Sequence, residues 1–118
     1  TSMGDLKGDY APKYEMILFA TKGRRLLNGG RDPNIVKFAR TGNKLHPTQK
    51  PVELISYLVN KSSKENDIVY DPFMGSGTTA EAAYDNKRNY IGSEIDETYY
   101  EISLTRIDRL ERQGKLLA

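Results

Sequence analysis

The sequence predicts an α/β fold with a mostly parallel sheet, and two observations in its second half carry this prediction. Residues 67–71 and 89–92 are short apolar runs of strand length, and each is followed by a helical pattern, over residues 78–85 and 97–112. A strand, a helix and a second strand in this order form a βαβ unit, whose right-handed crossover makes the two strands parallel. The 118 residues are enough for one small domain.

The last helical pattern is amphipathic. Its apolar residues recur every three or four positions, which is the spacing of one helical face. We expect this stripe to pack inward against the rest of the domain. The stripe consists of Tyr100, Leu104, Ile107 and Leu110.

The first half of the chain predicts three further elements. Residues 15–20 and 35–38 are short apolar runs that we expect to form strands, and the sequence between them is rich in Gly, Asn and Arg. Pro51 suits the first turn of a helix, where its missing N–H leaves no hydrogen bond unmade. Apolar residues after Pro51 recur on one face, so we expect a helix that reaches about Asn60.

The composition is typical of a soluble globular protein, with 37% apolar and 29% charged residues. No apolar run approaches the length of a membrane span, and no secretory leader is visible, so we expect a cytoplasmic protein. Cysteine is absent, and the single histidine, His46, cannot form a zinc site alone. We therefore expect no metal.

The net charge of +2 is unevenly distributed along the chain. Residues 22–50 contain eight basic residues and one acidic residue, Asp32, which gives +7, so the rest of the chain carries −5. A basic block on an otherwise acidic chain is typical of a surface that binds phosphates. The same block is equally typical of a solvated loop whose charges keep the protein in solution.

A glycine-bearing loop follows the first strand of the βαβ unit, where doubly wound folds bind their ligands. Gly75 and Gly77 allow the backbone to turn sharply and to approach a ligand closely. The helix that begins near Thr78 presents unpaired N–H groups, which favour a carboxylate or a phosphate. Asp71, at the end of the strand, places a negative charge beside the same point.

This loop also satisfies the loose dinucleotide pattern G-x-G-x-x-(G/A), with Glu94 nineteen positions after Gly75. Glu94 ends the next strand and is positioned to accept hydrogen bonds from ribose hydroxyls. A carboxylate at Asp71, however, would repel a pyrophosphate, and it suits a ligand that carries both a carboxylate and an ammonium group. A nicotinamide-dinucleotide-binding domain stays open as a disfavoured alternative.

Four segments of the chain resemble the DNA methyltransferases that modify exocyclic amino groups, in the permuted class often labelled beta. Residues 71–79 resemble their cofactor loop, and residues 46–51 resemble the segment that precedes it. Residues 90–96 resemble the ribose-binding strand end, and residues 14–23 the strand that follows the catalytic region. The resemblance implies a partial, incomplete S-adenosylmethionine-dependent methyltransferase fold of the Rossmann-like type, with S-adenosylmethionine as cofactor and DNA as substrate.

The resemblance also implies roles for individual residues. The residues expected to contact the cofactor are Asp71, Pro72, Phe73, Gly75, Ser76, Gly77, Thr78, Glu94, Ile95, His46, Thr48 and Lys50. Among them the loop residues line the methionine end, Glu94 holds the ribose and Ile95 packs near the adenine ring. His46 and Lys50 have an equally good interpretation as a turn residue and a solvated charge. The basic residues expected to face DNA are Arg24, Arg25, Arg31, Lys37, Arg40 and Lys44.

The chain does not contain the loop with which this family transfers the methyl group, (D/N/S)-P-P-(Y/F/W). That loop positions the amino group of a flipped-out base in line with the methyl group. The chain has five prolines and no two are adjacent. We therefore expect no catalytic residue here and no activity of the isolated chain. We expect a homodimer, or a complementing chain that carries the missing loop, and on resemblance alone adenine rather than cytosine as the target.

The expected organisation is a single partial methyltransferase domain over residues 1–118. Within it we expect a basic loop segment at residues 22–50 and a cofactor-binding βαβ portion at residues 46–118. A non-catalytic DNA-binding or regulatory module, which keeps the fold but uses only the basic segment, is the alternative function.

Overall fold

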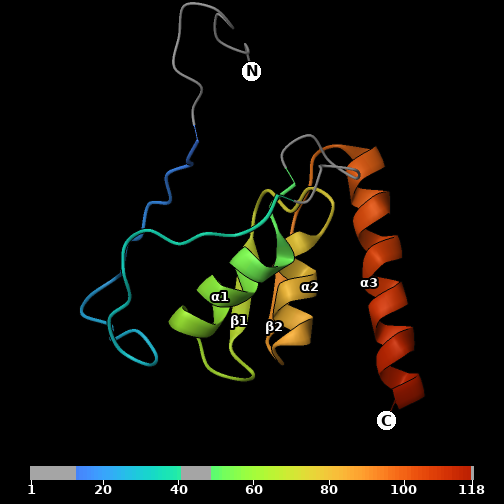
Figure 1. Cartoon of the computed structure of the whole chain (residues 1–118). Coiled ribbons are helices and arrows are strands. Elements are labelled where there is room, and N and C mark those ends of the chain that lie inside the picture. The colour runs from blue at the N-terminus through green and yellow to red at the C-terminus, as the bar shows by residue number, and fades with distance from the viewer. Residues whose placement is uncertain (1–12, 41–48, 118) are drawn as a thin grey trace, which may run out of the picture.

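The computed structural model describes residues 13–40 and 49–117, and its regular elements all lie in the second of these ranges (Figure 1). In chain order the elements are α1 (Val52–Ser62), β1 (Ile68–Asp71), α2 (Thr78–Asp85), β2 (Asn89–Gly92) and α3 (Glu97–Leu117). The helix expected after Pro51 is therefore present as α1.

The two strands form the predicted parallel pair. Ile68 lies opposite Asn89 and Asp71 lies opposite Gly92, and α2 is the connection between the strands. This confirms the βαβ unit. Because the strands are parallel, their carboxyl ends lie at the same edge of the sheet. The loop after Asp71 and the residues after Gly92 are therefore brought together.

Helix α2 is the centre of the structure, in contact with both strands and with α1 and α3. Its buried residues are small: Ala80 is 2% exposed, and Ala82 and Ala83 are fully buried. Side chains of this size allow neighbouring elements to approach α2 from several sides at once. The result is that α2 packs against the sheet, and α1 and α3 pack against α2 (Figure 1).

The opposite face of the sheet is uncovered within the described part of the chain. Ile68, Tyr70 and Ile91 point to this face and are 64%, 63% and 55% exposed, while Val69 and Tyr90, which alternate with them, are half-buried. Parallel sheets normally have helices on both faces. The exposed apolar face therefore marks a layer of an α/β fold that these residues do not supply.

Helix α3 packs through a different face from the predicted one. Ser103 is fully buried and Arg106 is 8% exposed, whereas Tyr100 and Leu104 are 40% and 41% exposed. The predicted stripe is thus wrong for these two positions, although Ile107 and Leu110 are half-buried.

Small residues at the contact explain why α3 buries a face other than the predicted one. A Cβ atom at Gly114 would lie 2.2 Å from the hydroxyl oxygen of Tyr84, and one at Gly77 would lie 3.1 Å from the Cβ of Ser103. Close approach of α3 to α2 and its preceding loop is therefore available only on the Ser103 and Gly114 side. Apolar periodicity does not register such a contact.

The two strands predicted in the first half are not formed. Residues 15–20 and 35–38 have no regular structure, and side chains in the first run are exposed, with Met16 at 86% and Leu18 at 97%. A strand needs a neighbour to take its backbone hydrogen bonds. Within residues 13–40 and 49–117, β1 and β2 pair only with each other, so residues 15–20 and 35–38 have no neighbouring strand to pair with.

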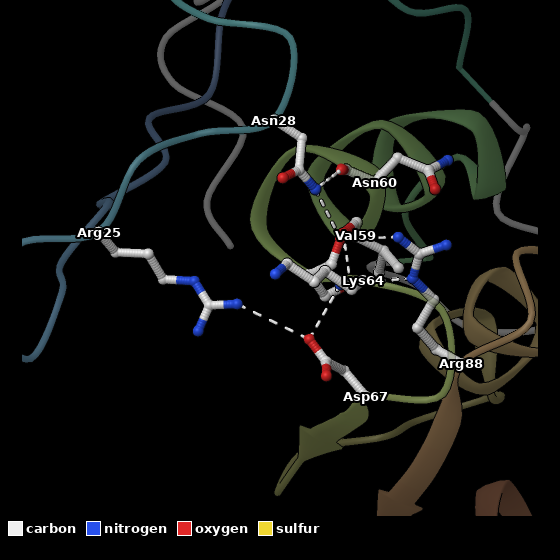
Figure 2. A network of polar contacts seen from close by, with 8 residues as sticks. Arg25, Asn28, Val59, Asn60, Lys64, Asp67 and Arg88 are labelled. Carbon is white, nitrogen blue, oxygen red and sulfur yellow. Dashed lines mark hydrogen bonds and ion pairs between the residues drawn. The ribbon is translucent and has the colours of Figure 1, made fainter.

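Residues 25–32 are instead attached to the C-terminal end of α1 (Figure 2). The Asn28 side-chain amide donates hydrogen bonds to the carbonyl oxygens of Asn60 and Ser63, at 2.8 and 2.7 Å. The Asn28 backbone N–H donates to the Lys61 carbonyl oxygen at 2.9 Å. These bonds satisfy carbonyl groups that the end of a helix otherwise leaves without a partner.

Candidate functional site

The candidate site is a pocket at the carboxyl ends of the two strands, beside the start of α2. Six of the residues expected at the cofactor line it, together with four others. The lining residues are Gln49, Lys50, Ile55, Asp71, Phe73, Met74, Gly75, Ser76, Thr78 and Thr79. Residues on α1, β1 and α2 that lie far apart in the sequence are thus brought around one space.

The backbone of the loop requires glycine at two points. Gly75 and Gly77 have φ angles of +54° and +86°, in the left-handed region that residues with a Cβ atom rarely adopt. Gly77 is also the residue before the first turn of α2, and its N–H donates to the Met74 carbonyl oxygen at 3.0 Å. The chain therefore turns sharply at Gly77 and directs the start of α2 at the pocket.

The carboxylate of Asp71 is held in a fixed orientation. One oxygen accepts a hydrogen bond from the Phe73 N–H at 3.0 Å, and the other accepts one from the Thr79 hydroxyl at 2.6 Å. The negative charge thus lies beside the first turn of α2. A ligand group that carries a positive charge next to a negative one would match this juxtaposition.

Glu94 connects the end of β2 with the loop. Its carboxylate accepts a hydrogen bond from the Gly75 N–H at 2.7 Å and another from the Asp96 N–H at 3.0 Å. The Met74 N–H also donates to the Ser93 carbonyl oxygen at 2.9 Å. In this structure the carboxylate that we expect to bind a ribose also holds the loop.

Two exposed apolar side chains lie close to the strand ends in the sequence. Phe73 follows β1 and is 86% exposed, and Ile95 follows β2 and is fully exposed. Exposed apolar side chains of this size often mark a surface that a ligand or a partner covers. Pro72, between Asp71 and Phe73, is exposed as well, and its carbonyl oxygen accepts a hydrogen bond from the Ser93 hydroxyl at 3.0 Å.

Lys50 lies at the entrance to the pocket, just before α1, where its ammonium forms an ion pair with Glu15. This ion pair and hydrogen bond hold the pKa of Glu15 below its ordinary value, and the charge of Arg40 lowers that pKa further. His46 and Thr48, which we also expect at the cofactor, lie outside the described residues.

Among the basic residues expected to face DNA, Arg25 is held at the end of the sheet away from the pocket. Arg25 forms an ion pair with Asp67 at 3.7 Å, just before β1, whereas the pocket lies beyond the other end of that strand (Figure 2). Arg24, Arg31, Lys37 and Arg40 are exposed, and Lys44 lies outside the described residues. The described basic segment therefore extends from one end of the sheet to the other.

Sequence reasoning missed two buried residues at the site. Arg106 on α3 donates hydrogen bonds to the Ser76 carbonyl oxygen at 3.1 Å and to the Thr78 hydroxyl at 3.3 Å. Met74 is 7% exposed and covers Gly92, where a Cβ atom would lie 2.4 Å from the Met74 sulfur. In the sequence, the one feature that could have indicated the burial of Arg106 is its position three residues after Ser103, on the same helical face.

The site has no metal cluster among the residues that the structure describes. No group of three or more His, Cys, Asp or Glu residues within them is arranged to hold a metal ion. Among the helices of the described segments, none combines the length and the apolar character needed to cross a membrane.

Comparison with known proteins connects this geometry to a family. A family model described as DNA methylase, for N6/N4 methyltransferases, matches residues 28–105. YubD of Escherichia coli (strain K12) is 36% identical over 100 residues, which are 85% of this chain and 44% of YubD. The type II methyltransferase M.HinfI of Haemophilus influenzae is 43% identical over 70 residues, which are 59% of this chain and 20% of that enzyme.

A solved structure shares the fold as well as the sequence. The crystal structure of the M1.HpyAVI–SAM complex superposes with a TM-score of 0.55 and 33% sequence identity, over 66% of this chain and 43% of that one. The chain spans less than half the length of the curated relatives it matches, from 20% to 44%. Because the family model covers more than half of the chain, including the loop, both strands and α2, the chain belongs to the DNA methylase family of amino-group methyltransferases.

Proposed function

We propose that this chain binds S-adenosylmethionine in the pocket at the strand ends, as the cofactor-binding portion of a DNA methyltransferase that methylates an exocyclic base amine. The observation that carries the proposal is the Asp71 carboxylate held beside the first turn of α2. The amino acid end of S-adenosylmethionine has an ammonium group and a carboxylate on one carbon. Asp71 would hold the ammonium, and the start of α2 the carboxylate.

The other residues of the site fit the rest of this cofactor. Gly75 and Gly77 would allow the methionine portion to lie against the backbone, and Glu94 would accept hydrogen bonds from the ribose hydroxyls. Ile95 offers exposed apolar surface for the adenine ring, and Phe73 offers it beside the methionine portion. When bound, S-adenosylmethionine supplies a methyl group that its sulfonium sulfur makes electrophilic. This chain's part is to bind and orient that cofactor.

We further propose that methyl transfer needs a second polypeptide portion that carries the (D/N/S)-P-P-(Y/F/W) loop. The chain contains no adjacent prolines, and its matched residues make up only 20% to 44% of the length of these relatives. The uncovered sheet face of Ile68, Tyr70 and Ile91 is a surface against which such a portion could pack. A complementing chain is one source of it, and a second copy of this chain would cover the face without supplying the loop.

Calorimetric titration of the full chain with S-adenosylhomocysteine tests cofactor binding. The wild-type chain should release heat on binding, and Asp71→Ala should abolish it. Asp67→Ala is the matched control, because Asp67 lies just before the same strand at its opposite end and bonds to Arg25 and the Lys64 N–H. Equal binding by wild type and Asp71→Ala, or absence of binding by the wild type, would overturn the assignment of this pocket.

The DNA substrate is tested separately. With tritiated S-adenosylmethionine and duplex DNA, we expect no transfer by the isolated chain and transfer once a polypeptide with the missing loop is added. Mass spectrometry of the digested DNA should then find N6-methyladenine, whereas N4-methylcytosine would overturn our choice of base. Transfer by the isolated chain would contradict the need for a second portion. DNA affinity that falls steeply with salt and ignores the cofactor would favour a non-catalytic DNA-binding module instead.

A further inference from the structure

Helix α3 packs against the loop between β1 and α2. Ser103 is fully buried against Gly77, where the Cβ of any larger residue would lie 3.1 Å from the Ser103 Cβ. One turn further along α3, the Arg106 side chain is 7% exposed and reaches the same loop. The loop thus contacts α3, although α2 and β2 lie between the two in the sequence.

The guanidinium of Arg106 connects the loop with the first turn of α2 through three residues. It donates to the Ser76 carbonyl oxygen in the loop at 3.1 Å and to the Thr78 hydroxyl at the start of α2 at 3.3 Å. Its Nε forms an ion pair and hydrogen bond with Glu81 in the first turn of α2. Ser76 and Thr78 are themselves 3% and 8% exposed, so water cannot easily replace these bonds.

The Arg106 charge lies in an electrostatically unfavourable position, so the presence of arginine there needs another explanation. A cation close to the N-terminal end of a helix opposes the helix dipole, and a buried ion pair often stabilises a fold less than apolar packing would. Glu81 offsets the charge of Arg106. What an apolar side chain could not provide is the set of directed bonds from Nη1 to Ser76 and Thr78 and from Nε to Glu81, for which the planar fork of arginine is suited.

We propose that Arg106 is a positioning residue of the cofactor site: it fixes the Ser76 carbonyl and the Thr78 hydroxyl so that the loop and the start of α2 keep the geometry that receives the cofactor. The proposal rests on the proposed function of the pocket. Arg106 itself lies behind the loop, bonded to Ser76, Thr78 and Glu81, and it acts on the ligand through the loop.

Arg88 provides a matched control. It is a partly buried arginine that also bonds to three acceptors: the Ser63 carbonyl at 2.7 Å, the Ser63 hydroxyl at 3.0 Å and the Asn86 carbonyl at 2.6 Å. Its side chain points toward the C-terminal end of α1 (Figure 2). It lies just before β2, at the end of the sheet away from the pocket. Arg106→Lys and Arg88→Lys both keep the charge and lose the fork, so a purely structural role predicts similar effects for both.

Amide hydrogen exchange of the full chain, measured by NMR without cofactor, tests the positioning directly. In Arg106→Lys we expect the Gly75 and Gly77 amides to exchange at least about tenfold faster than in wild type. In Arg88→Lys we expect the exchange rates of the same amides to change no more than the change in global stability accounts for. Loop exchange in Arg106→Lys that only follows global stability would overturn the proposal. If Arg106→Lys does not fold, Thr78→Val removes one of the three acceptors bonded to Arg106 at nearly constant volume and is expected to accelerate the same amides.

A calorimetric titration with S-adenosylhomocysteine completes the test. We expect affinity to fall at least about tenfold in Arg106→Lys and less than about twofold in Arg88→Lys, because a mobile loop must be ordered at the cost of binding energy. Unchanged affinity in Arg106→Lys would overturn the positioning role. If wild type binds no cofactor, the function of the pocket is wrong, and the exchange experiment still decides whether Arg106 orders the loop.

Discussion

Asp71 and Thr79 are joined by a hydrogen bond of 2.6 Å that links the end of β1 to the first turn of α2. The bond spans the whole glycine loop, whose two ends it holds together. It also fixes the Asp71 carboxylate before any ligand arrives, so less ordering is needed when one binds. The site is in this respect preorganised for a cationic group.

Replacing Asp71 by Asn tests the charge separately from the shape. The amide oxygen can keep the bond from the Phe73 N–H while the amide NH2 donates to the Thr79 hydroxyl oxygen, so we expect the chain to fold normally. Affinity for S-adenosylhomocysteine should fall by about tenfold to a hundredfold, because hydrogen bonds to charged groups contribute about 1.5–3 kcal/mol. Isothermal titration calorimetry measures this, and an affinity within about twofold of wild type would mean that the ammonium group binds elsewhere.

Replacing Gly77 by Ala should destabilise the chain through both strain and contact. Its φ angle is +86°, and the added Cβ would lie 3.1 Å from that of Ser103. Gly23, with φ +75° and no atom within 4 Å of the place that a Cβ would take, is the matched control for strain alone. We expect urea unfolding to show a loss for Gly77→Ala that exceeds that for Gly23→Ala by about 1–3 kcal/mol, the usual cost of overpacking. Equal losses would show that α3 moves aside freely.

Replacing Asp85 by Asn should stabilise the chain at neutral pH. Partial burial and the Glu81 carboxylate raise the pKa of Asp85, and its charge also lies at the C-terminal end of α2. A raised folded-state pKa means that wild type loses stability as pH rises from the ordinary carboxyl pKa through the folded value. The variant lacks this loss.

The expected gain for Asp85→Asn is about 0.3–1 kcal/mol at pH 7, the usual range for a charge at a helix end. The difference from wild type should shrink below about pH 4, where the aspartate is protonated in both the folded and the unfolded chain. Urea unfolding at pH 7 and pH 3.5 measures both values. A variant that is less stable than wild type at pH 7 would contradict this account of Asp85.

The uncovered sheet face should cause association of the isolated chain. We expect sedimentation velocity at micromolar concentration to detect dimers or larger species, and Tyr70→Thr with Ile91→Thr to shift the equilibrium towards monomer. Leu104→Thr is the control, because Leu104 is 41% exposed on α3, away from this face. A wild-type chain that is monomeric under these conditions would contradict the prediction.

The sequence by itself determined the βαβ unit, the glycine loop and the place of Asp71 at a strand end. Each of these depends on residues close together in the chain, where periodicity and glycine positions act locally. It also predicted that Asp71, Gly75 and Lys50 share one site. The pocket does bring them together, because parallel strands end at one edge and α1, which begins shortly after Lys50, packs against α2.

Only the tertiary structure decided whether apolar runs become strands and which face of α3 is buried. Residues 15–20 have the composition of a strand, but hydrogen bonding to a neighbour is a property of the assembled sheet. Ser103 and Arg106 are buried because a close helix contact favours small side chains and because the loop offers polar acceptors. Neither condition is encoded in the residues next to them, so the support of the site by α3 emerges only when distant segments meet.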